Sequence, residues 1–546
     1  MIKLGWMEKW TLRFVVLALL FLALSGFEGM LMRSQQYDID SLHGTEALLN
    51  QIRPGDVEPT TAELYYAMLT AHPIVGIYGF VYMSVFGAFY FLVPYLINKP
   101  VKHPKLVVTN FWLQIIGVMV CWASGFFDLF IALYTLYWPL PVSFDRVPVI
   151  GSIFFMLGAA AIMVNILLFS YNIFKTVLSK NGSGSYTLGQ FLRAAFGIPR
   201  LMKLLGKEDK HAVNMDYNGM PVFIVAVARG SIDTVINAIV LLSAGVLILV
   251  YGLFALFGNP LNPLAVDALI FKNIYWWGLD MVADGNALIY TAGVWYLLVP
   301  LLTGRKLFGA SVVKTVIMVD LLVSMGVWSH LLLGDPSQPM WMKLLSGQFI
   351  TWGEYFTMGL TIFVSLMTIW QARPVKMSPP MKFVLGSMFG FVMGGIAGLI
   401  QANVGLNVIF HNTQWVVALH AHTFLMAGVG TMLFSVIYTL VPILTTLEFK
   451  YQKLVNWHLW LWLIGSVSMA YAMGMAGSKG MLRRTLYTAG EFSPYTLVAI
   501  IGGTIAAIGF VIFLVNLVST LGFKTIFSLV KPGKMPEKPA EEAAAA

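Results

Sequence analysis

Long apolar runs separated by short polar connections form the dominant pattern along this chain. A helix that crosses a hydrocarbon core about 30 Å thick needs about 20 mostly apolar residues. The first apolar run is too long for a removable signal peptide and is not followed by a small-residue cleavage site. The pattern predicts an all-α, polytopic membrane protein: residues 1–530 form a single domain of about twelve transmembrane helices, and residues 531–546 form a disordered cytoplasmic tail. The twelve predicted segments lie near residues 11–33, 66–97, 106–137, 148–175, 229–258, 270–302, 309–334, 342–371, 381–402, 412–445, 455–478 and 492–520.

The composition supports this prediction and excludes several classes of protein. Of the 546 residues, 58% are hydrophobic and only 11% are charged, whereas soluble domains carry about 25% charged residues. A soluble enzyme and a disordered chain are therefore excluded, and the net charge of +9 does not indicate nucleic-acid binding because it follows membrane topology. The single cysteine, Cys121, excludes an intramolecular disulfide and the two-cysteine attachment of a covalent c-type haem.

Lysine and arginine positions predict the orientation of the helices. They concentrate at both termini and in the even-numbered connections, which the positive-inside rule places in the cytoplasm. The outward connections are poor in these residues, except for Lys479, Arg483 and Arg484 between the last two segments. Two interpretations remain open for this exception: tolerated loop charge, or an arginine pair that holds anions.

Four histidines lie inside predicted segments near the outer face: His72, His330, His420 and His422. An isolated intramembrane histidine is often only an interhelical hydrogen-bond donor, but four at one depth indicate a shared purpose. His420 and His422 are two residues apart, so on an α-helix they point roughly 200° away from each other. They must therefore serve different centres, and a planar macrocycle with an axial imidazole on each side of the helix satisfies this geometry.

This arrangement predicts two haems. His72 lies at a depth similar to that of His422 and can supply a second axial ligand, which gives one six-coordinate haem and one five-coordinate haem with an open face. Each haem carries propionates, and the outward arginines lie on the side where propionates would project. If Arg483 and Arg484 hold anions, haem propionates are therefore the expected ligands.

Carboxylates inside the predicted segments are a second candidate site, because intramembrane charges are costly and usually functional. Asp280 and Asp284 are four residues apart and share one helix face, and Glu354 lies about three turns into its segment. Together with His330 they form an oxygen and nitrogen ligand set that suits iron better than copper. The alternative is that one or two of them relay protons or pair with polar side chains such as Asn286.

Three segments resemble the catalytic subunit of the haem-copper oxidase superfamily. They are LTAHPIVGIYGFVYMSVFGAFYFLVP at 69–94, HNTQWVVALHAHTFLMAGVG at 411–430 and GMLRRTLY at 480–487. The first is similar to the family's low-spin haem ligand segment, the second to its two-histidine segment, and the third to its arginine pair. One difference is the spacing from His411 to His420, which is one residue longer than the family's usual spacing.

The resemblance implies the family's twelve-helix bundle and assigns roles to individual residues. His72 and His422 would bind a low-spin b-type haem, and His420 would bind the iron of a high-spin haem. Arg483 and Arg484 would hold the haem propionates.

The second metal site departs from the oxidase pattern. Oxidases use one histidine in the sixth helix, an adjacent pair in the seventh, and a tyrosine that in the commonest members follows the first histidine by four residues. Here Asp280 and Asp284 stand at the histidine and tyrosine positions, and His330 is followed by Leu331 instead of a second histidine. The sequence is closer to bacterial nitric oxide reductases, which have a glutamate four residues after the sixth-helix histidine and a second glutamate that Glu354 resembles.

Three functions follow as alternatives. The first is reduction of nitric oxide to nitrous oxide at the high-spin haem and a non-haem metal, with His330, Asp280, Asp284 and Glu354 as metal ligands and catalytic groups. The second is a terminal oxidase that reduces oxygen to water, for which Tyr355 and Tyr290 are the available phenols. The third is a non-catalytic haem b electron-transfer subunit whose binuclear site has degenerated.

The resemblance also implies cofactors, a partner and a location. The cofactors would be two haems and a non-haem iron or copper. The partner would be a small membrane-anchored subunit that donates electrons from a c-type haem or a cupredoxin domain on the outer face. The chain would span a bacterial-type inner membrane with both termini in the cytoplasm, and no nucleic-acid partner is expected.

Overall fold

The computed structural model describes most of the chain, and all structural statements below refer to that part. The side chains of Ala194 and Asp284 lie outside the description. The described residues are 4–42, 61–127, 130, 132–178, 187–196, 198, 202, 205–207, 221–327, 338–486 and 490–531.

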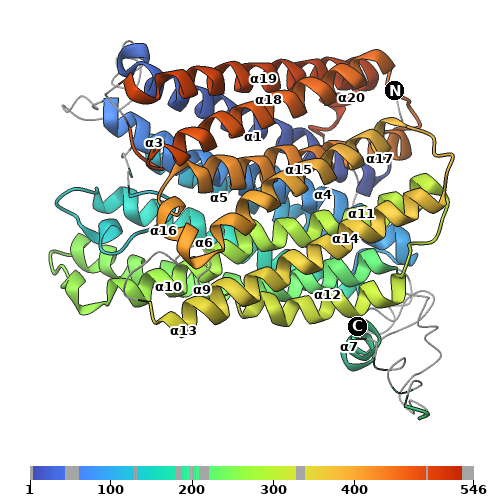
Figure 1. Ribbon diagram of the computed structural model, residues 1–546, viewed down its shortest axis with the longest axis horizontal. Helices are drawn as coiled ribbons and strands as arrows, with labels where there is room; N and C mark the ends of the chain where they lie inside the picture. Colours follow the sequence, from blue (N-terminus) through green and yellow to red (C-terminus); the bar gives the residue numbers. More distant parts are fainter. Residues whose placement is uncertain are drawn as a thin grey trace.

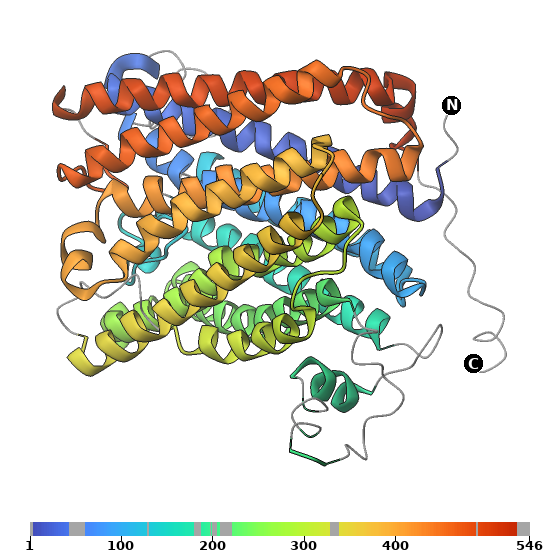
Figure 2. The ribbon, with the colours of Figure 1, turned by 45° about the vertical axis from the view of Figure 1, so that its right-hand side comes forward.

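Within these residues the structure is helical, with one isolated β-bridge between Thr413 and Leu482. Eleven continuous helical segments are long and apolar enough to cross a membrane. They run side by side as one bundle, with α18 and α19 on one edge and α12 and α14 on the opposite edge (Figures 1 and 2). The segments are α1 (Trp6–Tyr37), α3–η2–α4 (Thr61–Ile97), α5 (Pro104–Phe127), α6 (Val149–Val177), α9 (Val222–Leu256), α10–η5–α11 (Ala268–Thr303), α13–η7–α14 (Met340–Gln371), α15 (Pro379–Gln401), η8–α17 (Trp415–Thr445), α18 (Gln452–Ser478) and η9–α19 (Gly490–Leu521).

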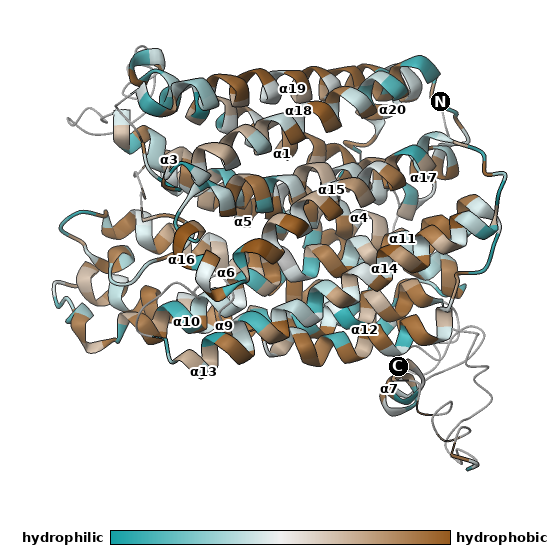
Figure 3. Ribbon diagram, viewed as in Figure 1, coloured by the Kyte–Doolittle hydropathy of each residue, from teal (hydrophilic) through white to brown (hydrophobic). Residues whose placement is uncertain are grey.

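The remaining predicted segment, 309–334, is represented by α12 (Ala310–Met325). Its 16 residues are fewer than the about 20 that a crossing needs, and residues 328–334 lie outside the described residues. Eleven of the twelve predicted segments are therefore helices of spanning length. Apolar residues lie along the helices, and hydrophilic residues concentrate in the connections and at helix ends (Figure 3).

Two predicted boundaries differ from the structure. The segment predicted at 106–137 ends at Phe127, and the chain from 132 onward forms turns and the short 3₁₀ helix η3 (Leu140–Val142) instead. Hydropathy cannot separate a spanning helix from an apolar connection that packs on the bundle. The segment predicted from 229 begins seven residues earlier, at Val222, so Arg229 lies two turns inside α9.

Four segments of this part of the chain are π-helical, and each contains a predicted site residue or lies within four residues of one. The segment η2 (Ile74–Tyr82) follows His72, and η8 (Trp415–Gly430) contains both His420 and His422. The segment η5 (Met281–Gly285) follows Asp280, and η7 (Lys343–Ile350) precedes Glu354. Because π-turns are rare and occur frequently at functional sites, their coincidence with these residues is independent support for a site here.

Small residues let α15 approach η8 closely. A Cβ on Gly390 would lie 2.3 Å from the backbone carbon of Ala427, and a Cβ on Gly394 would lie 2.8 Å from the backbone nitrogen of Phe424. Both positions therefore need glycine. The close approach brings the Gly394 carbonyl within hydrogen-bond distance of His420, so helix packing places a site residue directly.

Candidate haem and catalytic site

His72, on the last turn of α3 (Thr61–Pro73), and His422, in η8, face each other. Their ring centroids are 6.1 Å apart and their planes differ by only 11°. This separation leaves room for one iron atom between the rings, with metal–nitrogen bonds of about 2 Å. Histidines that are 350 residues apart in the sequence thus come together as a matched pair.

Backbone carbonyls fix the Nδ1 atoms of both rings. The Nδ1–H of His72 donates to the Ser25 carbonyl at 2.8 Å, and the Ser25 hydroxyl lies 3.1 Å from the same nitrogen. The Nδ1–H of His422 donates to the Val417 carbonyl at 2.6 Å. Such second-shell bonds set the tautomer and the orientation of ligating histidines, and they leave each Nε2 available as a ligand. The pair therefore fits a six-coordinate haem.

His420 lies on the other side of η8 and lines a different cavity. The residue is 7% exposed, and its Nδ1–H donates to the Gly394 carbonyl at 2.8 Å. The empty volume of this cavity, open solvent included, is about 750 Å³. The two histidines therefore lie on opposite sides of η8, as the two-residue spacing predicts.

The His420 cavity is rich in charged and hydroxyl side chains for a site inside a membrane protein. Its lining residues come from α9, η5, α11, α12, α14, α15 and η8 and the last residue of α10. They are Arg229, Asp280, Met281, Gly285, Leu288, Asp320, Ser324, Thr351, Glu354, Tyr355, Thr357, Met358, Phe391, Gly395, His420 and Phe424.

The structure brings together two of the four predicted metal ligands. Asp280 and Glu354 both line the His420 cavity. The backbone of Asp284 lies in η5, but its side chain is not described, and His330 and Leu331 lie outside the described residues. Among the described residues no group of three or more histidines, cysteines, aspartates and glutamates could hold a metal ion. Asp280 and Glu354 alone therefore do not form a complete metal site.

The two predicted phenols lie in different places. Tyr355 lines the His420 cavity, and a Cβ on Gly398 would lie 1.9 Å from its hydroxyl and 2.6 Å from the His420 ring, so both side chains border the same glycine. Tyr290 does not line this cavity, and its hydroxyl lies 3.3 Å from that of Thr234. Of the two, Tyr355 is therefore the phenol near the histidine.

Sequence reasoning missed a buried ion cluster beside the cavity, which consists of Arg229, Asp233 and Asp320. Arg229 pairs with Asp233 on its own helix and with Asp320 on α12, each at 3.1 Å. The signal was present, because an arginine and an aspartate four residues apart interrupt an apolar run. The predicted segment began at Arg229, which made that residue look like an ordinary helix-end charge.

The arginine pair is held against the start of η8. The Arg483 N–H donates to the Asn412 carbonyl and the Gln414 N–H donates to the Met481 carbonyl, both at 2.9 Å. The Arg484 guanidinium donates to the Tyr137 hydroxyl at 2.5 Å and lies 5.3 Å from the Trp276 ring centroid. This loop and the helix that carries both histidines are therefore fixed to each other.

The surroundings of Arg484 fit an anionic ligand. Burial raises the pKa of the Tyr137 phenol, but the positive charges of Arg484, Arg483 and Lys272 outweigh this effect and lower the pKa below its ordinary value. The Nε of Arg484 is buried and has no hydrogen-bond partner among the described residues. A buried guanidinium N–H without an acceptor suits a carboxylate such as a haem propionate.

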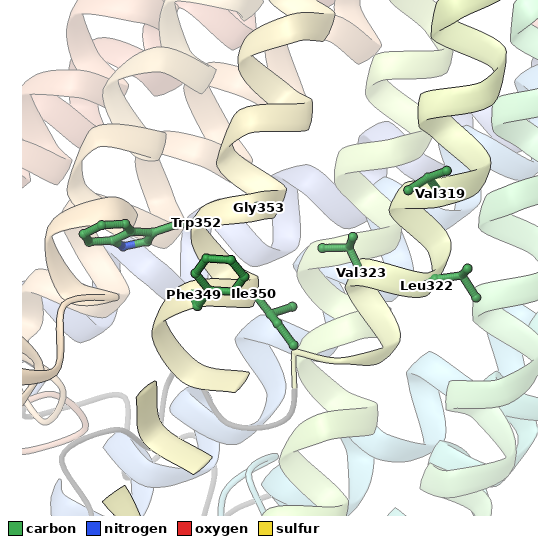
Figure 4. A pocket seen from close by; sticks show the side chains of 7 residues that line it. All are labelled: Val319, Leu322, Val323, Phe349, Ile350, Trp352 and Gly353. Carbon is green, nitrogen blue, oxygen red and sulfur yellow. The ribbon is translucent and has the colours of Figure 1, made fainter. Parts of the chain in front are cut away.

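An apolar groove lies next to the charged cavity, between α12 and α14. Its empty volume, open solvent included, is about 950 Å³, and its residues lie on α12, η7 and α14 (Figure 4). Val323 and Gly353 line the groove, whereas their chain neighbours Ser324 and Glu354 line the His420 cavity. The groove and the cavity therefore lie on adjoining faces of the same two helices. The residues of the groove are Val319, Leu322, Val323, Phe349, Ile350, Trp352 and Gly353.

Comparisons with known proteins agree with this architecture. The family described as "Cytochrome C and Quinol oxidase polypeptide I" matches residues 9–505. Cytochrome c oxidase polypeptide 1 of Halobacterium salinarum is 23% identical over 470 residues, which cover 84% of this chain and 71% of the relative. Quinol oxidase subunit 1 of Bacillus subtilis is 22% identical over 536 residues, which cover 95% of this chain and 72% of the relative.

A solved structure has the same fold. A cryo-EM structure of a haem-copper terminal oxidase dimer superposes with a TM-score of 0.70 at 19% identity, covering 94% of this chain and 84% of the other. The family consists of membrane-embedded oxidoreductases of respiratory electron transport that bind haems and a copper or other metal. Since the family match extends over nearly the whole bundle, this multi-pass membrane protein belongs to the haem-copper oxidase subunit I family.

Proposed function

We propose that this chain is the catalytic subunit of a membrane complex that reduces nitric oxide to nitrous oxide. The observation that carries the proposal is the pair of carboxylates, Asp280 and Glu354, in the cavity that His420 lines. Hard oxygen ligands favour a non-haem iron over copper. We assign Asp284 and His330 as the further ligands, and the position of Leu331 is consistent with a carboxylate in place of a second histidine.

The reaction joins two NO molecules with two electrons and two protons, and it yields nitrous oxide and water. Bound haem supplies iron that exchanges single electrons and binds diatomic gases. His72 and His422 would hold a low-spin haem, which would supply single-electron transfer, and His420 would hold a high-spin haem at the cavity. Glu354 and Asp284 carry protons to the gas-binding side, a task that suits carboxyl groups in a dry site. Arg483 and Arg484 neutralise the haem propionates.

We propose a small electron-donating subunit as the partner, with a c-type haem or a cupredoxin domain on the outer face. The chain itself has one cysteine, so it carries neither a covalent haem nor a two-cysteine copper site. We place it in a bacterial-type inner membrane with both termini in the cytoplasm, because lysines and arginines concentrate on that side.

The second candidate function is reduction of oxygen to water. Two observations favour it: Tyr355 borders the same glycine as His420, and the relatives reported above are named as oxidases of cytochrome c or quinol. In this case Tyr355 would provide an electron and a proton. A non-catalytic electron-transfer subunit is the third candidate, and the buried charges of the cavity speak against it because unused intramembrane charges are costly.

One experiment separates these functions. The complex is purified from membranes, its haem, iron and copper contents are measured, and its NO and oxygen consumption are recorded with a reduced donor. Two haems, one additional iron and NO turnover would support the proposal. One copper with oxygen turnover would favour the oxidase, and two haems with no further metal and no gas consumption would favour the electron-transfer subunit.

A further inference from the structure

Arg229 connects α9 to α12 at the edge of the His420 cavity. It is 1% exposed and lies two turns inside α9. One guanidinium nitrogen contacts Asp233 on the same helix, and the other contacts Asp320 and the Ser324 hydroxyl on α12. Since Arg229, Asp320 and Ser324 all line the cavity, this cation belongs to the wall of the cavity and is not a distant packing contact.

Both carboxylate oxygens of Asp320 are hydrogen-bonded. Its Oδ2 accepts from Arg229 at 3.1 Å, and its Oδ1 accepts from the Thr357 hydroxyl of α14 at 2.6 Å. Thr357 is one helical turn beyond Glu354, and its hydroxyl lies 2.8 Å from the Glu354 carbonyl oxygen. The contacts therefore lead from Arg229 through Asp320 and Thr357 to the turn of α14 that presents Glu354.

Asp233 accepts a hydrogen bond from the other terminal nitrogen of the Arg229 guanidinium. Its Oδ1 accepts from the Asn237 amide at 2.9 Å. The amide of Asn286 on α11, in the orientation that satisfies its neighbours, donates to Asp233 Oδ2 at 3.1 Å and accepts from the Thr234 hydroxyl at 2.9 Å. Arg229 thus has fixed partners on both sides, and a planar guanidinium that bridges two carboxylates is a rigid element.

The charges of the cavity give this arrangement a second consequence. Three carboxylates line it, those of Asp280, Asp320 and Glu354, and Arg229 is the one arginine or lysine among its lining residues. Charges act strongly over short distances in a medium of low dielectric constant. Because Arg229 pairs with two carboxylates, loss of its charge would make this wall more negative and would affect any redox group that His420 would hold.

We propose that Arg229 is a positioning residue of the active cavity: through Asp320 and Thr357 it fixes the turn of α14 that carries Glu354, and it supplies a permanent positive charge beside the high-spin haem. This inference rests on the proposed function in one respect, because it assumes that gas is reduced in the His420 cavity. A role limited to neutralising two buried aspartates is the competing explanation.

Four variants of the purified complex test this proposal. Arg229→Met removes the charge and the bridge, and Arg229→Lys keeps the charge but cannot bridge two carboxylates with a planar fork. The triple variant Arg229→Met/Asp233→Asn/Asp320→Asn removes the cluster without leaving a buried unpaired charge. The matched control is Lys99→Met, because Lys99 is a buried cation that donates to the Val177 carbonyl outside the cavity.

Three quantities are measured for each variant: kcat and KM for the gas that the unaltered complex consumes, the midpoint potential of each haem by redox titration, and the carbon monoxide difference spectrum of the high-spin haem. For Arg229→Met we expect kcat to fall about 10-fold to 100-fold, the range for outer-shell partners of a metal site, with KM nearly unchanged. The high-spin haem potential falls, because loss of a positive charge stabilises the oxidised iron, while the low-spin potential stays constant. Arg229→Lys recovers the potential but only part of kcat.

The triple variant decides between the two explanations. We expect it to bind both haems at the level of the unaltered complex and to remain slow, with a changed carbon monoxide spectrum. Wild-type kcat in this variant would overturn the proposal and leave Arg229 as a neutralising charge only. An unchanged high-spin potential in Arg229→Met would also overturn it. If the unaltered complex consumes neither NO nor oxygen, the proposed function fails, and the potentials and spectra still test the role of Arg229.

Discussion

The two candidate iron sites lie on opposite sides of the same helix and are built in different ways. At the first, two parallel imidazoles 6.1 Å apart are oriented by backbone carbonyls of α1 and η8. At the second, a single histidine shares a cavity with three carboxylates and an arginine from several helices. A backbone carbonyl also orients His420, but the charged groups around it depend on one another across several helices. The first site should therefore tolerate change around it, and the second should not.

The largest expected effect is the loss of a cofactor. His422→Ala removes one axial ligand of the first site, so we expect the low-spin haem spectrum to disappear while the high-spin haem retains its carbon monoxide spectrum. Absorption spectra of the purified complex measure both signals. His103→Ala, in the connection before α5, is the control and should alter neither. Two unchanged spectra in His422→Ala would show that η8 has been interpreted wrongly.

The next effect concerns the charged cavity. Glu354→Gln keeps the shape of the side chain but removes its ability to carry a proton or to act as an anionic ligand. We expect gas consumption to fall by about 10²-fold to 10⁴-fold, the contribution of a general acid or base, with the low-spin haem intact. Glu448→Gln, at an exposed position after α17, is the matched control. Full turnover in Glu354→Gln would remove this residue from the mechanism.

A smaller effect is expected beside His72, because a backbone carbonyl orients its ring. Ser25→Ala removes the hydroxyl beside His72 but leaves the Ser25 carbonyl that accepts from the His72 ring. We therefore expect haem to be retained and its loss in a haem-transfer assay to accelerate about 10-fold at most, the lower limit for an outer-shell partner. Ser34→Ala on the same helix, whose hydroxyl donates to the Met30 carbonyl, should change nothing. A complete loss of low-spin haem in Ser25→Ala would contradict the view that carbonyls dominate.

The smallest effect concerns access of gas to the cavity. The apolar groove, which Val323 and Gly353 line, and the His420 cavity lie on adjoining faces of α12 and α14. If an apolar gas crosses here from the bilayer, Val323→Phe should raise KM for the gas by a factor of a few without changing kcat. Val312→Phe, at an exposed position of α12, is the control. A KM equal to that of the control would mean that gas reaches the site by another path.

Much of the first site could be predicted from the sequence, and much of the second could not. Histidines are conspicuous in an apolar helix, and the two-residue spacing of His420 and His422 requires two separate centres on any helical turn of similar width. The spanning segments follow from composition alone because the bilayer demands long apolar runs. The roles of these residues as haem ligands, and that of His330 at the second metal, stay predictions.

The charged network could not be predicted from the sequence, because the contacts between its residues on different helices form only when those helices pack together. Arg229 stood at the edge of a predicted segment, and Asp320 lay in an apolar run with no partner nearby in sequence. Only the packing of α9 against α12 brings them to 3.1 Å. Hydropathy also extended the third segment to residue 137, because the connection after Phe127 is as apolar as the helix before it.

The π-helical turns also affect how this chain tolerates changes in length. A π-turn contains one more residue than an α-turn between its hydrogen-bonded partners, and the His422 ring bonds to the carbonyl five residues before it. The longer His411–His420 spacing that the sequence resemblance implies can be accommodated in the wide turns of η8, which continue into α17. The number of residues in this helix therefore matters as well as their identity. Deletion of one residue before His420 would rotate both imidazoles away from their sites, although both histidines would still be present in the sequence.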